Sequence, residues 1–378
     1  MVINFSQKID QDEEKASDKR SLYNKINDYV LSIAKIPLKE RLFFVQHLGL
    51  MLKSGISLSI GIKTLADQTE HQYFAKILRD IGSNVEKGTS FAKSLEPHSK
   101  IFGEMFIAMI EAGELSGKLE EVLHELFIQM KKSHALKSKV KGALTYPAVI
   151  IIAMLGIGTF MMIFVVPKIT GMFDNLEAEL PLPTKILIGI SDTLVNNGVL
   201  SAIVVIALAF AFFQALKTQK GKYIFQAILL KAPIFGPIIK KINIASFSRN
   251  ISSLLRTDIM IIRTFEITAK VLGNLHYRAA LNKMAEKIKK GGKLHEVIKV
   301  NPKLFPPVVT QMVAIGEETG ELDNILAELA EFYENEIDQI MENLPAIIEP
   351  VLILVLGLGV GGVAVAIIMP MYSITTAI

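Results

Sequence analysis

Three long apolar segments constrain this chain more than any other feature of its sequence. They run over Ala148–Val166, Val199–Leu216 and Ala346–Met369, and the only charged residue within them is Glu349. At about 1.5 Å per residue, a helix of this length spans close to the ~30 Å hydrocarbon core of a bilayer. We therefore expect three transmembrane helices.

The composition agrees with alternating membrane and water-soluble parts. Hydrophobic residues make up 51% of the chain and the mean hydropathy is +0.40, while charged residues still reach 21%. The chain has no cysteine, which excludes disulfides and thiolate metal sites. A net charge of +4 on a chain of 378 residues argues against nucleic acid as the main partner.

The distribution of lysines predicts how the chain is oriented in the membrane. Residues 131–141, before the first apolar segment, and residues 217–241, after the second, carry several lysines and no acid, whereas residues 168–198 carry four acids and two lysines. Positive flanks stay in the cytoplasm, so residues 168–198 should lie outside. The charged first twenty residues lack a signal-peptide pattern, and we expect a cytoplasmic N-terminus. The third segment has an acidic approach, and its direction is assigned by alternation alone.

The chain is also an internal repeat. Residues 44–167 overlay on residues 247–370 without a gap, so that Phe44 falls on Phe247. The two stretches share residues at informative positions: Gly88 and Gly291, Phe102 and Phe305, Gly113 and Gly316, Glu114 and Glu317, Gly117 and Gly320, Pro147 and Pro350, and Pro167 and Pro370. Each repeat thus has a soluble part and a closing apolar segment.

The soluble part of each repeat is predicted to be helical. In the first repeat, apolar spacing indicates helices at Leu38–Lys53, Leu58–Gln68, Gln72–Glu86, Ser90–Leu95 and Phe102–Glu111, and one from Lys118 into the first span. We expect an all-α membrane protein with two repeated cytoplasmic bundles and three transmembrane helices. The expected parts are a charged N-terminal segment (1–40), bundle 1 (41–145), transmembrane helix 1 (146–167), a short extracytoplasmic loop (168–198), transmembrane helix 2 (199–216), bundle 2 (217–345), transmembrane helix 3 (346–370) and an extracytoplasmic tail (371–378).

Both repeats contain the pattern Gly-Glu-x-Ser/Thr-Gly-x-Leu, as GELSGKL from Gly113 and GEETGEL from Gly316. Its glycines favour a helix-turn-helix corner, in which Gly113 and Gly316 end one helix and Ser116 or Thr319 caps the next. Alternatively, Glu114 and Glu317 are exposed beside the turn and contact a partner.

A second motif, KVKGALTYP, begins at Lys139 at the start of the first span, which closes with Val-Val-Pro at Pro167. Together with the corner motifs and the opening sequence FVQHLGLMLKSGISL from Phe44, it resembles the type II secretion F and type IV pilus PilC family of inner-membrane platform proteins. The resemblance covers nearly the whole chain beyond its charged start. The second repeat departs from the first where Asp258 replaces Gly55 and Glu349 replaces Tyr146.

The resemblance implies an inner-membrane platform that couples a cytoplasmic hexameric assembly ATPase to the addition or removal of pilin or pseudopilin subunits. It also implies contacts with other inner-membrane assembly proteins and with lipid, and we expect a homo-oligomer without a cofactor. The positions that carry family motifs or are candidates for partner contact are Gly113, Glu114, Gly117, Tyr146, Pro147, Pro167, Gly316, Glu317, Gly320, Glu349, Pro350 and Pro370. Glu349 either lies at the headgroup level or pairs, buried, with a pilin N-terminus. The Gly357–Gly361 spacing favours close helix packing.

Enzyme signatures are missing from the sequence: it has no GxxxxGK[ST] phosphate loop, no HExxH and no GxSxG. We therefore expect no catalytic or metal-binding residue, and any mechanical work must come from an external motor. The alternative is a small multi-pass transporter or channel subunit, although the spans contain few polar residues to line a path. A membrane enzyme would need a site of unrecognised pattern.

Overall fold

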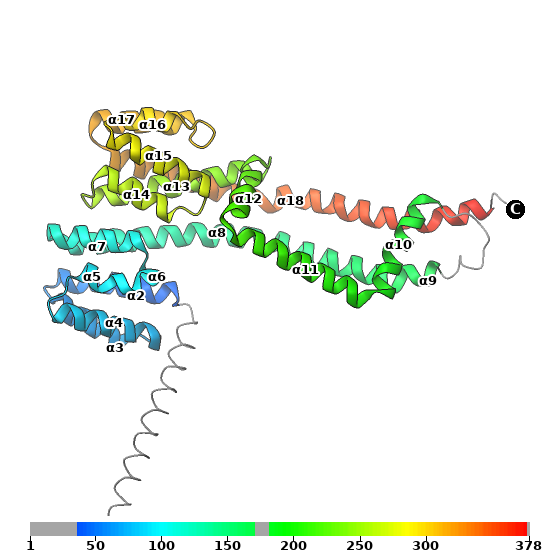
Figure 1. Cartoon of the computed structure of the whole chain (residues 1–378), viewed down its shortest axis with the longest axis horizontal. Helices are drawn as coiled ribbons and strands as arrows, with labels where there is room; N and C mark the ends of the chain where they lie inside the picture. The colour runs from blue at the N-terminus through cyan, green and yellow to red at the C-terminus, as the bar shows by residue number, and fades with distance from the viewer. Residues whose placement is uncertain (1–35, 171–180, 376–378) are drawn as a thin grey trace, which may run out of the picture. The chain divides into compact units, whose positions relative to one another are not determined.

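The computed structural model describes residues 36–170 and 181–375 (Figure 1). The expected N-terminal segment (1–40), the loop (168–198) and the tail (371–378) lie partly outside these residues. The described chain is helical and contains no strand, which confirms the predicted all-α class. It divides into two units: unit 1 comprises the described residues up to Ser133 with Ser246–Gly273 and Arg278–Leu329, and unit 2 comprises His134–Ala245, Asn274–Tyr277 and the chain from Ala330 onward.

The first repeat contributes a run of short helices to unit 1. They are α2 (Leu38–Lys53), α3 (Leu58–Gln68), α4 (Gln72–Glu86), α5 (Phe91–Leu95), α6 (Ser99–Phe102), α7 (Glu104–Ser116) and the start of α8 (Leu119–Phe160). The helices predicted at α2, α3 and α4 are confirmed. The helix predicted over Phe102–Glu111 is present as α7 with different ends. Gly103 adopts a φ of 90° and separates α6 from α7, so α7 begins at Glu104 and continues to Ser116.

The second repeat has matching helices at equivalent positions. They are α13 (Phe235–Arg256), α14 (Ile261–Val271), α15 (Leu275–Lys289), α16 (Leu294–Lys299), α17 (Pro307–Thr319) and α18 (Leu322–Thr375). In the gapless overlay α14 falls on α3, α15 on α4 and α17 on α7, with the same first and last positions. The predicted duplication is thus confirmed in the folded chain.

Aromatic side chains fill the centre of each repeat. In the first, the ring of Phe44 lies 5.9 Å from that of Phe74 and 6.2 Å from that of Phe102. In the second, the equivalent Phe247 lies 5.1 Å from Phe305. Burying each such side chain contributes about 1.5–3 kcal/mol, so these rings help to hold the short helices together.

Unit 2 contains the long apolar helices. Three helices are long and apolar enough to cross a membrane: the one through Leu119–Ile169, α11 (Gly198–Lys217) and α18. The pair α12 (Gln219–Lys231) and α13 passes the same test only if both helices are taken together, and they are bent by 110°. We count three spans because α13 continues into the core of the second repeat, where Phe247 is fully buried.

The connection between the first two spans contains a helix that the sequence analysis did not predict. This helix, α10 (Leu182–Asn196), begins after Pro181 and packs Leu187 against Val166 and Ala366, near the ends of the first and third spans. A π-helical segment, Met161–Val165, precedes α9 (Val166–Thr170) at the end of the first span.

Candidate functional site

The two glycines of each corner motif have different structural tasks. Gly113 and Gly316 are buried inside α7 and α17. A Cβ atom on Gly113 would lie 2.7 Å from Cγ2 of Val122, so any side chain here would collide with α8. The helices instead end at Gly117 and Gly320, with φ of 72° and 78°. The expectation that the first glycine of the motif ends the helix is therefore wrong, because the second one does so.

The hydroxyl residues before the terminal glycines bond backward along their own helices. Ser116 Oγ donates to the Ala112 carbonyl at 2.8 Å, and Thr319 Oγ1 donates to the Ile315 carbonyl at 2.9 Å. Thr319 also accepts a long 3.4 Å bond from the N–H of Glu321. The expectation that the hydroxyl caps the following helix is wrong for Ser116.

The glutamate of each corner reaches back to the short helix that precedes it. Glu114 accepts hydrogen bonds from the backbone N–H groups of Phe91 at 2.7 Å and Ala92 at 3.1 Å. Glu317 repeats this arrangement with the N–H groups of Leu294 at 2.7 Å and His295 at 3.2 Å. Both oxygens of each carboxylate thus satisfy free donors at a helix N-terminus, where negative charge is also favoured. This geometry favours a structural role over an exposed partner contact.

Glu317 has one partner that Glu114 lacks. Its Oε2 lies 2.6 Å from Nδ1 of His295, and this histidine replaces the alanine of the first repeat. Burial raises the pKa of the Glu317 carboxyl, but the hydrogen bonds from the Leu294 N–H and from the side chain and backbone of His295 outweigh it and leave the pKa below its usual value. The carboxylate is therefore held in its charged form.

The motif residues where the first and third spans begin occupy equivalent positions on α8 and α18. Pro147 lies inside α8 and is buried, while Tyr146 before it is exposed. Glu349 and Pro350, their equivalents on α18, are both exposed. Within the described chain no hydrogen bond or ion pair forms at Glu349, so the structure gives it no buried partner.

The prolines that close the spans each leave a carbonyl without its helical donor, and α10 supplies the replacement. Pro370 has no N–H to offer the Ala366 carbonyl, which accepts from Thr184 Oγ1 at 2.6 Å. In the π-helical segment, the N–H of Val166 donates to the carbonyl of Met161, five residues earlier. The next bond of this pattern would run from residue 167 to the carbonyl of Met162, but Pro167 has no N–H to donate. The carbonyl left over is that of Met162, and it accepts from Ser191 Oγ at 2.7 Å.

Acidic residues on the approach to the third span contact the basic approach to the first. Lys139 Nζ lies 2.9 Å from Asp338 and 3.4 Å from Glu342. The hydrogen bond that Lys139 donates to Asp338 is the largest cause of the raised pKa of Lys139. Lys241 similarly pairs with Glu336 at 3.2 Å. These pairs lie within unit 2.

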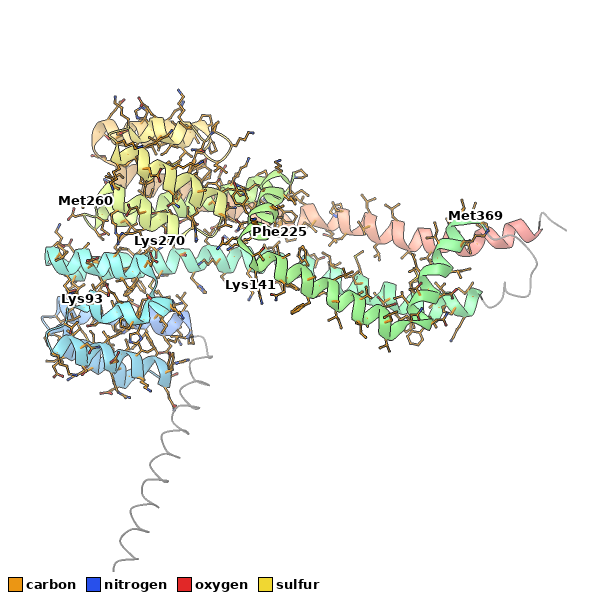
Figure 2. All side chains as sticks on the ribbon, viewed as in Figure 1. Lys93, Lys141, Phe225, Met260, Lys270 and Met369 are labelled. Carbon is orange, nitrogen blue, oxygen red and sulfur yellow. The ribbon has the colours of Figure 1, made fainter. Side chains whose placement is uncertain are left out.

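The two repeats contact each other inside unit 1, and the sequence analysis did not find the residues that form this contact. Helices α7 and α14 lie side by side (Figure 1), and Figure 2 shows Lys270 of α14, whose Nζ lies 2.8 Å from Glu104 of α7. Polar pairs that cross the contact between described residues include Glu104–Lys270, Lys118–Asp258, Glu125–Ser253 and Gln129–Asn250.

Asp258 shows what one difference between the repeats does. It stands where the first repeat has Gly55, and it keeps the positive φ of that glycine, 59° against 81°. Aspartate tolerates this conformation better than most residues, and its carboxylate lies 2.9 Å from Lys118 of the first repeat. Beside this pair is a cleft of about 360 Å³, whose lining includes Leu115, Met260 and Arg263.

Residues 36–170 and 181–375 hold no group of three or more histidine and carboxylate side chains placed to bind a metal ion. The site residues therefore fall into three structural groups: the corners, the contact between the repeats, and the prolines at the membrane helices. The distances between these side chains and their partners describe packing, capping and pairing between helices.

Comparison with known proteins agrees with the duplication. The family model described as "Type II secretion system (T2SS), protein F" matches residues 44–167 and again 247–370. The chain is 34% identical to the type IV pilus assembly protein PilC of Thermus thermophilus over 337 residues, which cover 89% of this chain and 83% of the relative.

Two further relatives extend the comparison to both kinds of machinery. The type IV pilus assembly protein PilC of Myxococcus xanthus is 32% identical over 340 residues, 90% of this chain and 81% of the relative. The type II secretion system protein F of Aeromonas hydrophila is 26% identical over 327 residues, 86% of this chain and 84% of the relative.

Proposed function

Because the chain belongs to the type II secretion system protein F family, as both of its repeats match that family's model, we propose that it is a platform protein of the cytoplasmic membrane. In this role it takes part in assembling a type IV pilus or a type II secretion filament. The observation that carries the proposal is the match over nearly the whole chain to relatives named for pilus assembly and for type II secretion.

The platform transmits work that a separate motor supplies. We assign the motor to a cytoplasmic hexameric assembly ATPase and the load to pilin or pseudopilin subunits, in contact with other inner-membrane assembly proteins. The sequence has no phosphate-binding loop of its own. Helices α8 and α18 each run from a corner of a repeat into a span without a break in the chain, so a displacement at the corner has a continuous helix to follow.

Both bundles, residues 41–145 and 217–345, lie in the cytoplasm with the N-terminus in this proposal. The lysines before the first span support that orientation. The pairing of Lys139 with Asp338 and Glu342 supports a common side for the approaches to the first and third spans, although the second approach is acidic. An acidic segment can remain beside the cytoplasmic leaflet when lysines neutralise it.

Labelling of single cysteines tests the orientation, since the native chain contains none. Lys137→Cys and Asn197→Cys change exposed residues on either side of the first two spans. A membrane-impermeant maleimide applied to spheroplasts should label Asn197→Cys, and should label Lys137→Cys only after lysis. Labelling of Lys137→Cys in intact spheroplasts would overturn the topology.

A deletion strain tests the function itself. Loss of the chain should abolish surface filaments or secretion, and the tagged full-length protein should co-purify with the assembly ATPase and with pilin. The matched control is the same strain complemented with the native chain. Unchanged filaments and secretion in the deletion strain, with neither protein co-purified, would overturn the proposal.

A further inference from the structure

The contact between the two repeats is head-to-tail, which means that each repeat uses a different face. The first repeat contributes α7 and the start of α8, with Glu104 and Glu125, and the second contributes α13 and α14, with Ser253 and Lys270. In the first repeat, the helices equivalent to α13 and α14 are α2 and α3. In the second repeat, the helices equivalent to α7 and α8 are α17 and α18. These equivalent helices take no part in the pairs. A head-to-tail contact leaves two complementary faces open by necessity.

The face of the first repeat that this contact leaves open carries exposed apolar side chains, at positions whose equivalents in the second repeat are covered by the contact. Leu50 is 60% exposed, whereas its equivalent Ser253 is 1% exposed and donates to Glu125 across the contact at 2.7 Å. Ile56 is exposed, and its equivalent Ile259 packs against the core of the first repeat. With Ile60, which is also exposed, these residues form what we call the α2–α3 face.

The open face of the second repeat shows the same relationship. Val308 is 42% exposed, whereas its equivalent Met105 is 6% exposed and contacts Gln129. Ile315 is exposed at the position of Ala112, which lines the cleft between the repeats. With Glu328, the equivalent of Glu125, these residues form what we call the α17–α18 face.

We propose that the α17–α18 face of one chain binds the α2–α3 face of a second chain, in the arrangement that already joins the two repeats within each chain. The exposed isoleucines, leucine and valine supply the apolar area that such a contact buries. A cleft of about 250 Å³ lies beside Leu50, and its lining includes Lys53, which pairs with Glu120 of the same repeat at 3.4 Å. The α17–α18 face carries the carboxylate of Glu328, and Glu321 lies directly before α18, so this end of the second repeat is acidic where it would approach Lys53.

The membrane permits this assembly. Each repeat is followed by its own span, and the proposed topology points the first and third spans the same way. If a second chain is added by repeating the contact that joins the two repeats, its spans therefore point the same way as those of the first chain, and both chains lie in one bilayer with the same orientation. Head-to-tail contacts of this kind close into rings or continue as open arrays. Self-association through these faces requires only the exposed and buried equivalents described above, whether or not the chain meets an ATPase.

Disulfide trapping in membranes distinguishes the arrangement. Leu50→Cys and Glu328→Cys change the equivalents of Ser253 and Glu125, so the two thiols should meet between chains. Two differently tagged full-length chains, one with each change, are co-expressed and oxidised. The double variant Glu125→Cys with Ser253→Cys in a single chain is the positive control and should form a disulfide within the chain.

The expected result is a disulfide-linked dimer that contains both tags, several-fold more abundant than any dimer of either variant expressed alone. Equal dimer formation by Leu50→Cys alone would show a two-fold contact of like faces and overturn the head-to-tail proposal. Failure of the mixed pair to cross-link, while the positive control does, would overturn self-association through these faces and leave them to a different protein.

A second measurement is independent of thiol chemistry. Leu50→Asp places a charge on the α2–α3 face, and Val300→Asp makes the same change at an exposed valine outside both faces. Light scattering of the detergent-purified protein should give the same oligomer mass for the native chain and Val300→Asp, and a smaller mass for Leu50→Asp. A native chain that is monomeric, or an oligomer unchanged by Leu50→Asp, would contradict the proposal.

Discussion

The carboxylate of Glu317 accepts a hydrogen bond from the backbone N–H of Leu294 at 2.7 Å. The first repeat has the same bond between Glu114 and Phe91 at 2.7 Å. In both repeats the glutamate thus acts as the N-terminal cap of a short helix from more than twenty residues away. A helix as short as α5 or α16 has little stability of its own, and this cap fixes it to the corner.

Replacing either glutamate should destabilise its repeat. Glu114→Gln and Glu317→Gln remove the charge from a helix N-terminus and turn one acceptor oxygen into a donor, which should cost about 1–2 kcal/mol each. Thermal unfolding of the purified protein measures the effect. Glu318→Gln, at an exposed neighbouring position, is the control and should change stability by less than about 0.5 kcal/mol. Equal effects at 317 and 318 would contradict the capping role.

The lowered pKa of Glu317 gives a pH dependence of defined sign. A carboxyl whose pKa is lower in the folded than in the unfolded protein stabilises the fold above the unfolded value, near 4.3, and this contribution is lost as the pH falls through the folded pKa. The difference in melting temperature between the native chain and Glu317→Gln should therefore shrink on acidification from about pH 6 to below pH 4. A difference that grows over this range would contradict the assignment.

Local signals in the sequence were sufficient for most helix boundaries of the first repeat. α3 and α4 are amphipathic, and the breaks around them contain Ser57 and Gly88, so apolar spacing located their ends. The three spans followed from length and lack of charge, because lipid leaves few alternatives to a helix.

Features that depend on distant residues could not be predicted in this way. The role of Glu114 is set by Phe91 and Ala92, which follow a different turn, and the motif alone also allowed an exposed acid. The task of Gly113 depends on Val122 of the next helix. The contact between the repeats joins residues more than one hundred positions apart, as in Gln129 and Asn250, so periodicity along the chain carried no signal for it.

The two corner glycines should respond differently to alanine. Gly113→Ala places a Cβ atom 2.7 Å from Val122 Cγ2 in a packed core and should cost about 1–3 kcal/mol. Gly117→Ala forces alanine into a left-handed conformation at a helix end, at a cost of about 1 kcal/mol without a collision.

Gly142→Ala is the matched control for these glycines. Gly142 lies inside α8, and a Cβ atom there would meet nothing within 4 Å. The substitution should be neutral or stabilise the helix by up to about 1 kcal/mol. Thermal unfolding of the three variants gives the order, and a Gly113→Ala protein as stable as Gly142→Ala would show that the corner can open to accept a side chain.

The hydroxyl of Thr184 should stabilise the protein because Pro370 has no N–H to donate to the Ala366 carbonyl. Thr184→Val keeps the shape of the side chain and leaves the buried Ala366 carbonyl without its donor, which should cost about 0.6–1.7 kcal/mol within a membrane protein. Thr193→Val is the control, since the Thr193 hydroxyl is exposed and bonds only to the carbonyl of Gly189 on its own helix. Unfolding in mixed micelles measures both.

A second substitution tests whether the missing N–H of Pro370 is the reason why the Thr184 hydroxyl stabilises the protein. Pro370→Ala restores a backbone N–H that can reach the Ala366 carbonyl along α18, so Thr184→Val should cost less in the Pro370→Ala background than in the native one. The difference between the two costs is the coupling between the hydroxyl and the proline. If Thr184→Val costs the same in both backgrounds, the hydroxyl stabilises α10 by packing alone, and the carbonyl left by the proline has no part in its effect.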